Sequence, residues 1–171
     1  MKEIMDKSDI ERYLQMVGEE LAAKGQKGKI LLVGGAVMIL IVGNRNSTRD
    51  IDGSFEDGAQ AIREAVSHVA AREGLPADWL NDGAKGFLYS QPPVTLWRDY
   101  LGLEIYLPSL DYLLAMKIVA GRDQDIEDAK ALIWKLGILK TQEVLEVLEK
   151  YIPVRLLTPR VQYTVEDLFV E

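Results

Sequence analysis

The pattern of apolar and polar positions predicts an alternation of helices and strands from the start of the chain. A helix over about residues 9–24 is predicted because apolar residues recur there every three or four positions, at Ile10, Tyr13, Leu14, Val17 and Leu21. Ser8-Asp9-Ile10-Glu11 has the pattern of a capping box at the start of this helix, and Gly25 fits its end.

Two strands are expected next. Residues 29–33 are apolar without alternation, which is typical of a central strand buried on both faces. Gly34-Gly35 then predicts a turn, and residues 36–42 predict a short buried helix. Thr48–Phe55 is expected to form the second strand.

The rest of the chain predicts an α+β fold, that is, a small mixed sheet packed with helices and followed by a helical C-terminal part. We expect helices over about 56–73, 110–120, 124–136 and 142–151, strands over 94–97 and 101–107, and a short final helix near Thr164. Trp79 and Leu80 are expected to form a packing point. The predicted organisation is a core over residues 1–108 with a helical part over residues 109–171 packed on the same domain.

Composition removes several classes of function. The chain of 171 residues has no Cys and one His, so Cys-ligated zinc and a Ser-His triad are not expected. The N-terminus lacks the apolar core of a signal peptide, and the longest apolar run, residues 36–42, is too short to span a bilayer. We therefore expect a cytoplasmic protein without a membrane partner. The net charge of −7 argues against broad coating of nucleic acid, but leaves a local contact with RNA open.

Asp50 and Asp52 are the clearest candidates for chemistry. On a strand they would project to one face, with their Cα atoms about 6.5 Å apart, while Ile51 between them enters the core. Two such charges repel by roughly 3 kcal/mol at an effective dielectric near 20, and a shared cation would remove that cost. The alternative is an edge strand with two solvated acids. We expect a Mg²⁺ site here, with Mn²⁺ as the substitute ion.

Gly34 and Gly35 lie between a strand and a helix N-terminus, where backbone amides can approach a phosphate closely. The alternative is a tight turn with no ligand. Arg45 and Arg49 flank the acid pair and would neutralise a polyphosphate or orient the carboxylates; alternatively, they only balance local acids.

Four further residues could extend the site. Glu104 lies in the apolar strand 101–107 and is expected to be a third metal carboxylate or an edge residue facing water. Lys117 lies on a nearly apolar helix, from which it either extends to water or reaches a polar cleft. Asp125 and Asp128 share one helix face, as catalytic support or as ordinary acids near a helix N-terminus.

Taken together, these motifs resemble those of a known group. Gly34-Gly35-Ala36 followed by Arg45-Asn-Ser-Thr-Arg-Asp50-Ile-Asp52 is similar to the first motif of the nucleotidyltransferase superfamily with the DNA-polymerase-β-like fold. Leu114-Ala-Met-Lys117, Gly121-Arg122 and Asp125-Ile-Glu-Asp128 resemble the second motif of its AbiEii-type abortive-infection branch and uncharacterised relatives. The two motifs cover residues 30 to 136.

The resemblance implies a role for each matching residue. Gly34 and Gly35 would hold the triphosphate, Asp50 and Asp52 would bind two Mg²⁺ ions, and Lys117 would contact phosphate, with Asp125, Asp128 and Arg122 beside it. The implied reaction transfers a nucleoside monophosphate from a nucleoside triphosphate to a hydroxyl of RNA, a protein or a small molecule. Some relatives act as toxins, so an antitoxin partner is a further expectation. Gly53, where the family usually has a bulky apolar residue, is a departure from the motif.

Two other functions stay open at this point. One is a nucleotide-binding module of the same fold that has lost turnover. The other is a phosphatase of the haloacid dehalogenase type, because Asp50-Ile-Asp52-Gly53-Ser54 is similar to that family's Asp-x-Asp-Gly-Thr loop, in which the first Asp is the nucleophile. In that family the loop normally ends an apolar strand, whereas here the preceding residues are polar.

Overall fold

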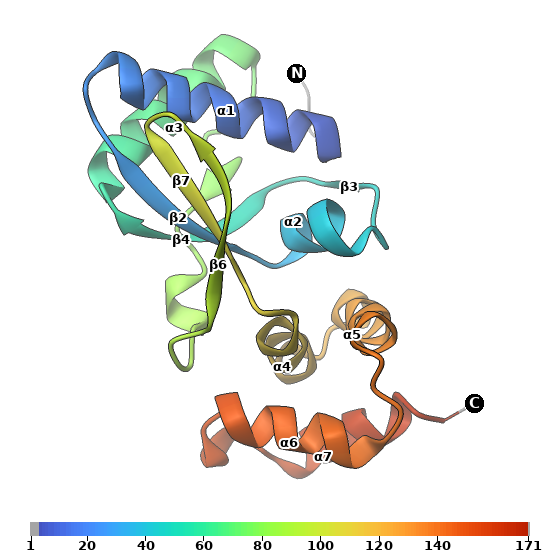
Figure 1. The fold of residues 1–171 in the computed structure, drawn as a ribbon. Coiled ribbons are helices and arrows are strands. Elements are labelled where there is room, and N and C mark those ends of the chain that lie inside the picture. Colours follow the sequence, from blue (N-terminus) through green and yellow to red (C-terminus); the bar gives the residue numbers. More distant parts are fainter. Residues whose placement is uncertain (1–3, 171) are drawn as a thin grey trace. The chain divides into compact units, whose positions relative to one another are not determined.

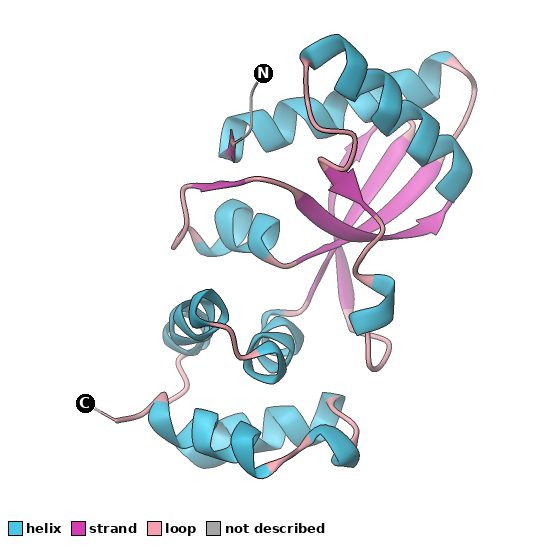
Figure 2. Ribbon diagram, turned by 180° about the vertical axis from the view of Figure 1, so that it is seen from behind, coloured by secondary structure: helices cyan, strands magenta, loops and turns pink. Residues whose placement is uncertain are grey.

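The computed structural model of the chain describes residues 4–170, and these form two compact units. The first unit runs to Lys85 and includes Val94–Pro108; the second comprises Gly86–Pro93 and the residues from Ser109 onward. Strands lie in the first unit and helices dominate the second, as the colours of Figure 2 show. The predicted α+β class is therefore confirmed.

The first unit is built on a five-stranded mixed sheet with the order β5-β4-β2-β7-β6. Its strands are β2 (Gly28–Val33), β4 (Ile51–Asp57), β5 (Leu80–Asn81), β6 (Val94–Tyr100) and β7 (Leu103–Pro108). β2 pairs antiparallel with β4 on one side and parallel with β7 on the other. All of β2 except Lys29 is buried, which confirms the predicted central strand.

Two long helices, α1 (Lys7–Ala23) and α3 (Ala59–Glu73), cover one face of this sheet (Figure 1). α1 packs on β6 and β7, and α3 packs on β2 and β4. The buried side of α3 is the stripe that its periodicity predicted, with Ile62, Val66 and Val69 facing inward. α3 begins later than expected, because β4 continues to Asp57.

The start of α1 differs from the prediction. Asp6, not Ser8, is the N-cap: its carboxylate accepts a hydrogen bond of 2.9 Å from the Asp9 amide, and the Asp9 carboxylate accepts one of 3.0 Å from the Asp6 amide. The physical reason is the short strand β1 (Met5–Asp6), which pairs with β3 (Ser47–Thr48) and holds the chain extended up to the helix start.

The predicted strand over residues 48–55 is divided in two. β3 ends at Thr48, and β4 begins only at Ile51. Between them the Thr48 hydroxyl donates a hydrogen bond of 3.0 Å to the Asp50 carbonyl oxygen, which closes a turn. Asp50 therefore lies just before β4, and the expectation that both acids belong to one strand was wrong.

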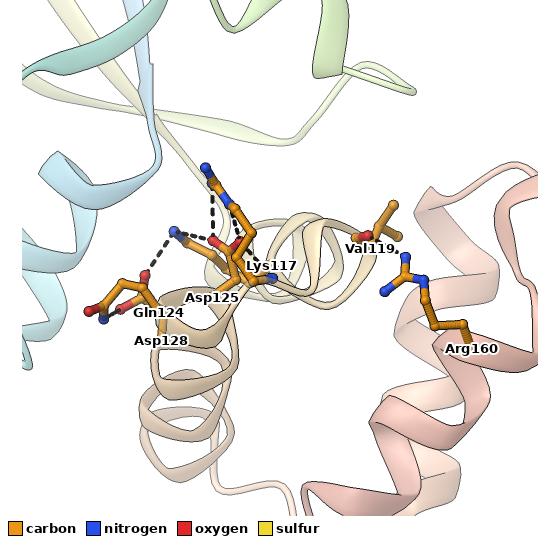
Figure 3. Close-up of polar contacts among 7 residues, drawn as sticks. Lys117, Val119, Gln124, Asp125, Asp128 and Arg160 are labelled. Atoms are coloured by element: carbon orange, nitrogen blue, oxygen red, sulfur yellow. Dashed lines mark hydrogen bonds and ion pairs between the residues drawn. The ribbon is translucent and has the colours of Figure 1, made fainter.

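The second unit consists mainly of four helices. They are α4 (Leu110–Ala120), α5 (Asp123–Leu136), α6 (Thr141–Tyr151) and α7 (Pro159–Asp167). Short connections join them, and one of these includes the 3₁₀ turn η3 (Val154–Leu156). Another 3₁₀ turn, η2 (Lys85–Phe87), lies where the chain passes from the first unit to the second. α4 is apolar on nearly all sides and packs against the other three helices, as expected of a central buried helix. Its end is capped by Arg160 of α7, which donates a hydrogen bond of 2.9 Å to the Val119 carbonyl (Figure 3).

The predicted helices of this unit are confirmed to within a residue at their starts, except the last, which begins at Pro159 rather than near Thr164. Thr158 caps that helix and proline occupies its first turn, which explains the earlier start. Within residues 4–170, none of the helices combines the length and the apolar character needed to cross a membrane.

Candidate functional site

The glycine turn and the second aspartate lie side by side because the ends of two paired strands meet. Val33, the last residue of β2, is the register partner of Asp52 in β4, and Gly34 follows directly. Gly34 has φ +71°, and a Cβ built on it would lie 3.5 Å from Oδ2 of Asp52. The positive φ favours glycine at this position, and the Asp52 carboxylate lies within van der Waals range of the place that its Cβ would take.

The second glycine contacts a different side chain. A Cβ at Gly35 would collide with Nη1 of Arg45, so the Arg45 guanidinium occupies the space that a side chain would need. Gly35 opens the helical segment formed by α2 (Gly35–Val37) and the π-helical residues Met38–Val42, confirming the helix expected here. An arginine thus lies against the backbone at a helix start, where an anion would also be favoured.

Next to this turn is a hollow of about 440 Å³ lined by Ile4, Arg45, Ser47, Thr48, Arg49 and Asp50. Arg49 and Asp50 are exposed, and Ser47 and Thr48 are half-buried. The hollow presents guanidinium and hydroxyl donors, which suit phosphate or hydroxyl groups of a ligand.

Asp50 and Asp52 interact electrostatically although Asp50 lies outside the strand. Partial desolvation of its carboxylate raises the pKa of Asp50 although the residue as a whole is exposed, and the charges of Asp52 and Asp78 raise it further. Ile51 between them is fully buried, as expected. Crowded negative charge of this kind is relieved by a divalent cation, so the pair fits Mg²⁺, which proteins often hold by one or two carboxylates together with phosphates and waters.

Glu104 does not join this pair. Glu104 is the register partner of Lys29 on β2, whereas Asp52 is the partner of Val33 on the same strand. The two residues are therefore about 13 Å apart along the strand direction. The Glu104 carboxylate instead accepts a hydrogen bond of 2.6 Å from the Tyr106 hydroxyl. The expectation of a third metal carboxylate at Glu104 therefore does not fit the register. Among residues 4–170, no cluster of three or more His, Cys, Asp or Glu side chains that could hold a metal ion is present.

One residue of this region was not anticipated. Asn81, on β5 beside β4, donates a hydrogen bond of 3.1 Å from Nδ2 to Oδ1 of Asp52. Nothing in the local sequence Leu80-Asn-Asp-Gly83 connects it with residue 52. Only the parallel pairing of the two-residue strand β5 with β4 brings the two side chains together.

The second motif forms a buried ionic cluster in the helical unit, drawn in Figure 3. The Lys117 ammonium group lies 3.3 Å from Oδ1 of Asp125 and 2.8 Å from Oδ2 of Asp128. Asp125 and Asp128 share one face of α5, as their spacing predicted. Lys117 is only 6% exposed, so it does not extend to water; it lies between two carboxylates.

Arg122 completes the cluster. Its Nε lies 2.7 Å from Oδ2 of Asp125, and its backbone amide donates to the same oxygen at 3.2 Å. Burial alone would raise the pKa of Asp125, but the hydrogen bond from Arg122 and the charge of Lys117 outweigh it and hold the pKa below its usual value. The Asp128 carboxylate also accepts a hydrogen bond of 3.0 Å from Gln124.

The arrangement of β4 argues against the phosphatase reading. The Asp-x-Asp sequence lies where β4 starts, with Asp50 just before the strand and Asp52 as its second residue, and β4 is antiparallel to its neighbour β2. A nucleophilic loop of the haloacid dehalogenase type ends its strand instead. The residues before Asp50 form a turn and the short strand β3, so no long apolar strand leads into the acid pair.

Comparison with known proteins is consistent with this geometry. Residues 12–152 match a protein-family model described as a nucleotidyltransferase of unknown function (DUF6036). No curated protein and no solved structure matched the chain. The family match extends over both units and includes the glycine turn, the acid pair and the ionic cluster. The chain therefore belongs to this family of nucleotidyltransferases of unknown function.

Proposed function

We propose that this protein is a Mg²⁺-dependent nucleotidyltransferase that moves a nucleoside monophosphate from a nucleoside triphosphate to a hydroxyl acceptor. The observation that carries the proposal is the short distance between Asp52 and the glycine turn: Oδ2 of Asp52 lies 3.5 Å from the position that a Cβ on Gly34 would occupy. It places a potential metal ligand directly beside a turn whose amides could hold a phosphate chain. The family match supports the same class of reaction.

In this reaction the acceptor oxygen bonds to the α-phosphorus as the bond to the bridging oxygen of the β-phosphate breaks. Pyrophosphate leaves, and the proton of the acceptor hydroxyl passes to a water molecule of the solvent. Asp50 and Asp52 would hold Mg²⁺, which supplies charge stabilisation and activation of the hydroxyl when bound. No covalent intermediate on the protein is needed, so its residues act by binding and orientation.

The arginines contribute binding energy in this proposal. Arg45, which lies against Gly35, is placed to pair with a phosphate at the turn, and Arg49 lines the adjacent hollow. Phosphate contact by Lys117 remains a prediction from the resemblance. Its described partners are Asp125 and Asp128 of its own unit.

The test is transfer of label from α-labelled nucleoside triphosphates in the presence of Mg²⁺, offered with RNA, with protein and with small hydroxyl compounds. We expect label transfer and pyrophosphate release by the unchanged protein and neither by Asp52→Asn. Asp57→Asn is the matched control, since Asp57 is an exposed acid at the other end of β4. Transfer that persists in Asp52→Asn would contradict the proposal.

A nucleotide-binding module without turnover is the second candidate. It is favoured by the lack of a third ligating side chain at the acid pair within residues 4–170. Mg²⁺-dependent nucleotide binding that is lost in Asp52→Asn, with no product from any acceptor, would support it.

The finer AbiEii-type assignment adds a biological expectation. If the chain is a toxin of that branch, its expression should arrest the growth of the host cells, and expression of the Asp52→Asn variant should allow normal growth. An antitoxin would then be a partner that relieves the arrest. Normal growth on expression of active enzyme would count against the toxin role and leave the transferase proposal intact.

A further inference from the structure

Asn81 is held in one orientation by three contacts. Its Nδ2 donates to Oδ1 of Asp52 at 3.1 Å and to the Asp78 carbonyl at 3.4 Å, while its Oδ1 accepts a bond of 2.9 Å from the Gly83 amide. Two acceptors face the amide nitrogen and one donor faces the amide oxygen, so a flipped side chain would lose all three bonds.

Gly83 is part of this arrangement. A Cβ at Gly83 would lie 2.7 Å from Oδ1 of Asn81, closer than real side chains tolerate. The loop therefore needs glycine at position 83 to donate its amide to Asn81 without displacing the side chain. Asn81 is also the register partner of Asp52 in the β4–β5 pair, which sets the distance between the two side chains.

The two oxygens of Asp52 consequently have different surroundings. Oδ1 accepts the hydrogen bond from Asn81, and Oδ2 faces Gly34. A carboxylate anchored through one oxygen cannot rotate freely about its last torsion, so the other oxygen keeps its direction.

We propose that Asn81 is a positioning residue that fixes the Asp52 carboxylate with Oδ2 directed toward the glycine turn, ready to bind a divalent cation. The inference rests on the proposed function, because it assigns Asp52 to metal binding. Ordering a ligand before the ion arrives lowers the cost of binding, and loss of such outer partners typically weakens metal affinity about 10–100-fold.

The experiment measures Mn²⁺ affinity by electron paramagnetic resonance, together with the midpoint of urea unfolding and the steady-state constants for the nucleotide. Asn81→Leu preserves the side-chain volume and removes the amide. We expect about a tenfold weaker Mn²⁺ affinity, a lower kcat and an unchanged nucleotide KM. Asp82→Asn is the control from the same loop, since Asp82 binds the Phe55 amide, Arg63 and Lys85 but not Asp52.

Gly83→Ala provides a second test, because it keeps the side-chain amide of Asn81 but displaces it. It should weaken Mn²⁺ binding in the unchanged protein and have no further effect in the Asn81→Leu background. If the Mn²⁺ affinity is equal in Asn81→Leu and Asp82→Asn while Asp52→Asn abolishes binding, the positioning role of Asn81 is overturned and the proposed metal site at Asp52 stands. Mn²⁺ binding that survives Asp52→Asn would overturn both this inference and the assignment of Asp52 to the metal.

Discussion

The ammonium group of Lys117 lies 2.8 Å from Oδ2 of Asp128, and both side chains are buried. Asp125 lies on the other side of the same ammonium group at 3.3 Å. The pair joins α4 to α5 through charges removed from water. Such a pair costs desolvation when it forms, but removing one partner leaves an uncompensated buried charge.

We therefore expect Lys117→Met to lower the free energy of unfolding by about 3–5 kcal/mol, because two buried carboxylates lose their cation. Urea unfolding followed by circular dichroism would measure this. Lys130→Met is the control: Lys130 pairs with Glu127 at 3.2 Å on the exposed side of α5, and its loss should cost less than about 1 kcal/mol. Equal losses for the two variants would mean that the buried cluster contributes nothing special to stability.

Gly34→Ala should reduce nucleotide binding beyond its cost in stability. Gly34 has φ +71° and ψ −147°, a region that is essentially reserved for glycine, so alanine there is strained by roughly 1–3 kcal/mol, and its methyl group would lie 3.5 Å from Oδ2 of Asp52. Gly74→Ala is the comparison at a glycine in the left-handed helical region, φ +67° and ψ +37°, where alanine is strained by roughly 1–2 kcal/mol and the surrounding space is open. Calorimetric titration with Mg²⁺ and a nucleoside triphosphate should show weaker binding only for Gly34→Ala. Comparable affinities in the two variants would separate the glycine turn from the nucleotide site.

Stability should depend on pH through Asp111. Burial alone would raise the pKa of Asp111, but hydrogen bonds from neighbouring groups, including the Tyr151 hydroxyl at 2.9 Å and the Tyr112 amide at 2.8 Å, hold the pKa below its usual value. A carboxylate with a lowered folded pKa stabilises the protein above its unfolded pKa of about 3.9, and this contribution is lost as the pH falls through the folded pKa.

The unfolding free energy of the unchanged protein should therefore fall more steeply below about pH 4 than that of Asp111→Asn. Urea titrations between neutral and acidic pH would measure both curves. Asp123→Asn, which alters an exposed acid in the first turn of α5, should follow the unchanged protein. If the curve of Asp111→Asn runs parallel to the other two, the contact between α4 and α6 is not the origin of the pH dependence.

Local pattern was enough to predict most elements of this protein. The apolar run 29–33, the stripe on α3 and the glycines that end α3, α4 and α5 each act over a few residues, so their outcome depends little on the rest of the chain. The common face of Asp125 and Asp128 follows in the same way, since helical geometry alone brings side chains at i and i+3 together.

The tertiary structure decided which strands pair and in what register, because pairing joins residues distant in sequence. Pairing of β3 with β1 removed Asp50 from the strand, and the register of β7 carried Glu104 away from Asp52. The parallel pairing of β5 with β4 placed Asn81 beside Asp52. The sequence alone thus determined which residues carry charge and where most helices lie, while strand pairing and other long-range hydrogen bonds set the starts of α1 and α3 and determined which of those charges meet.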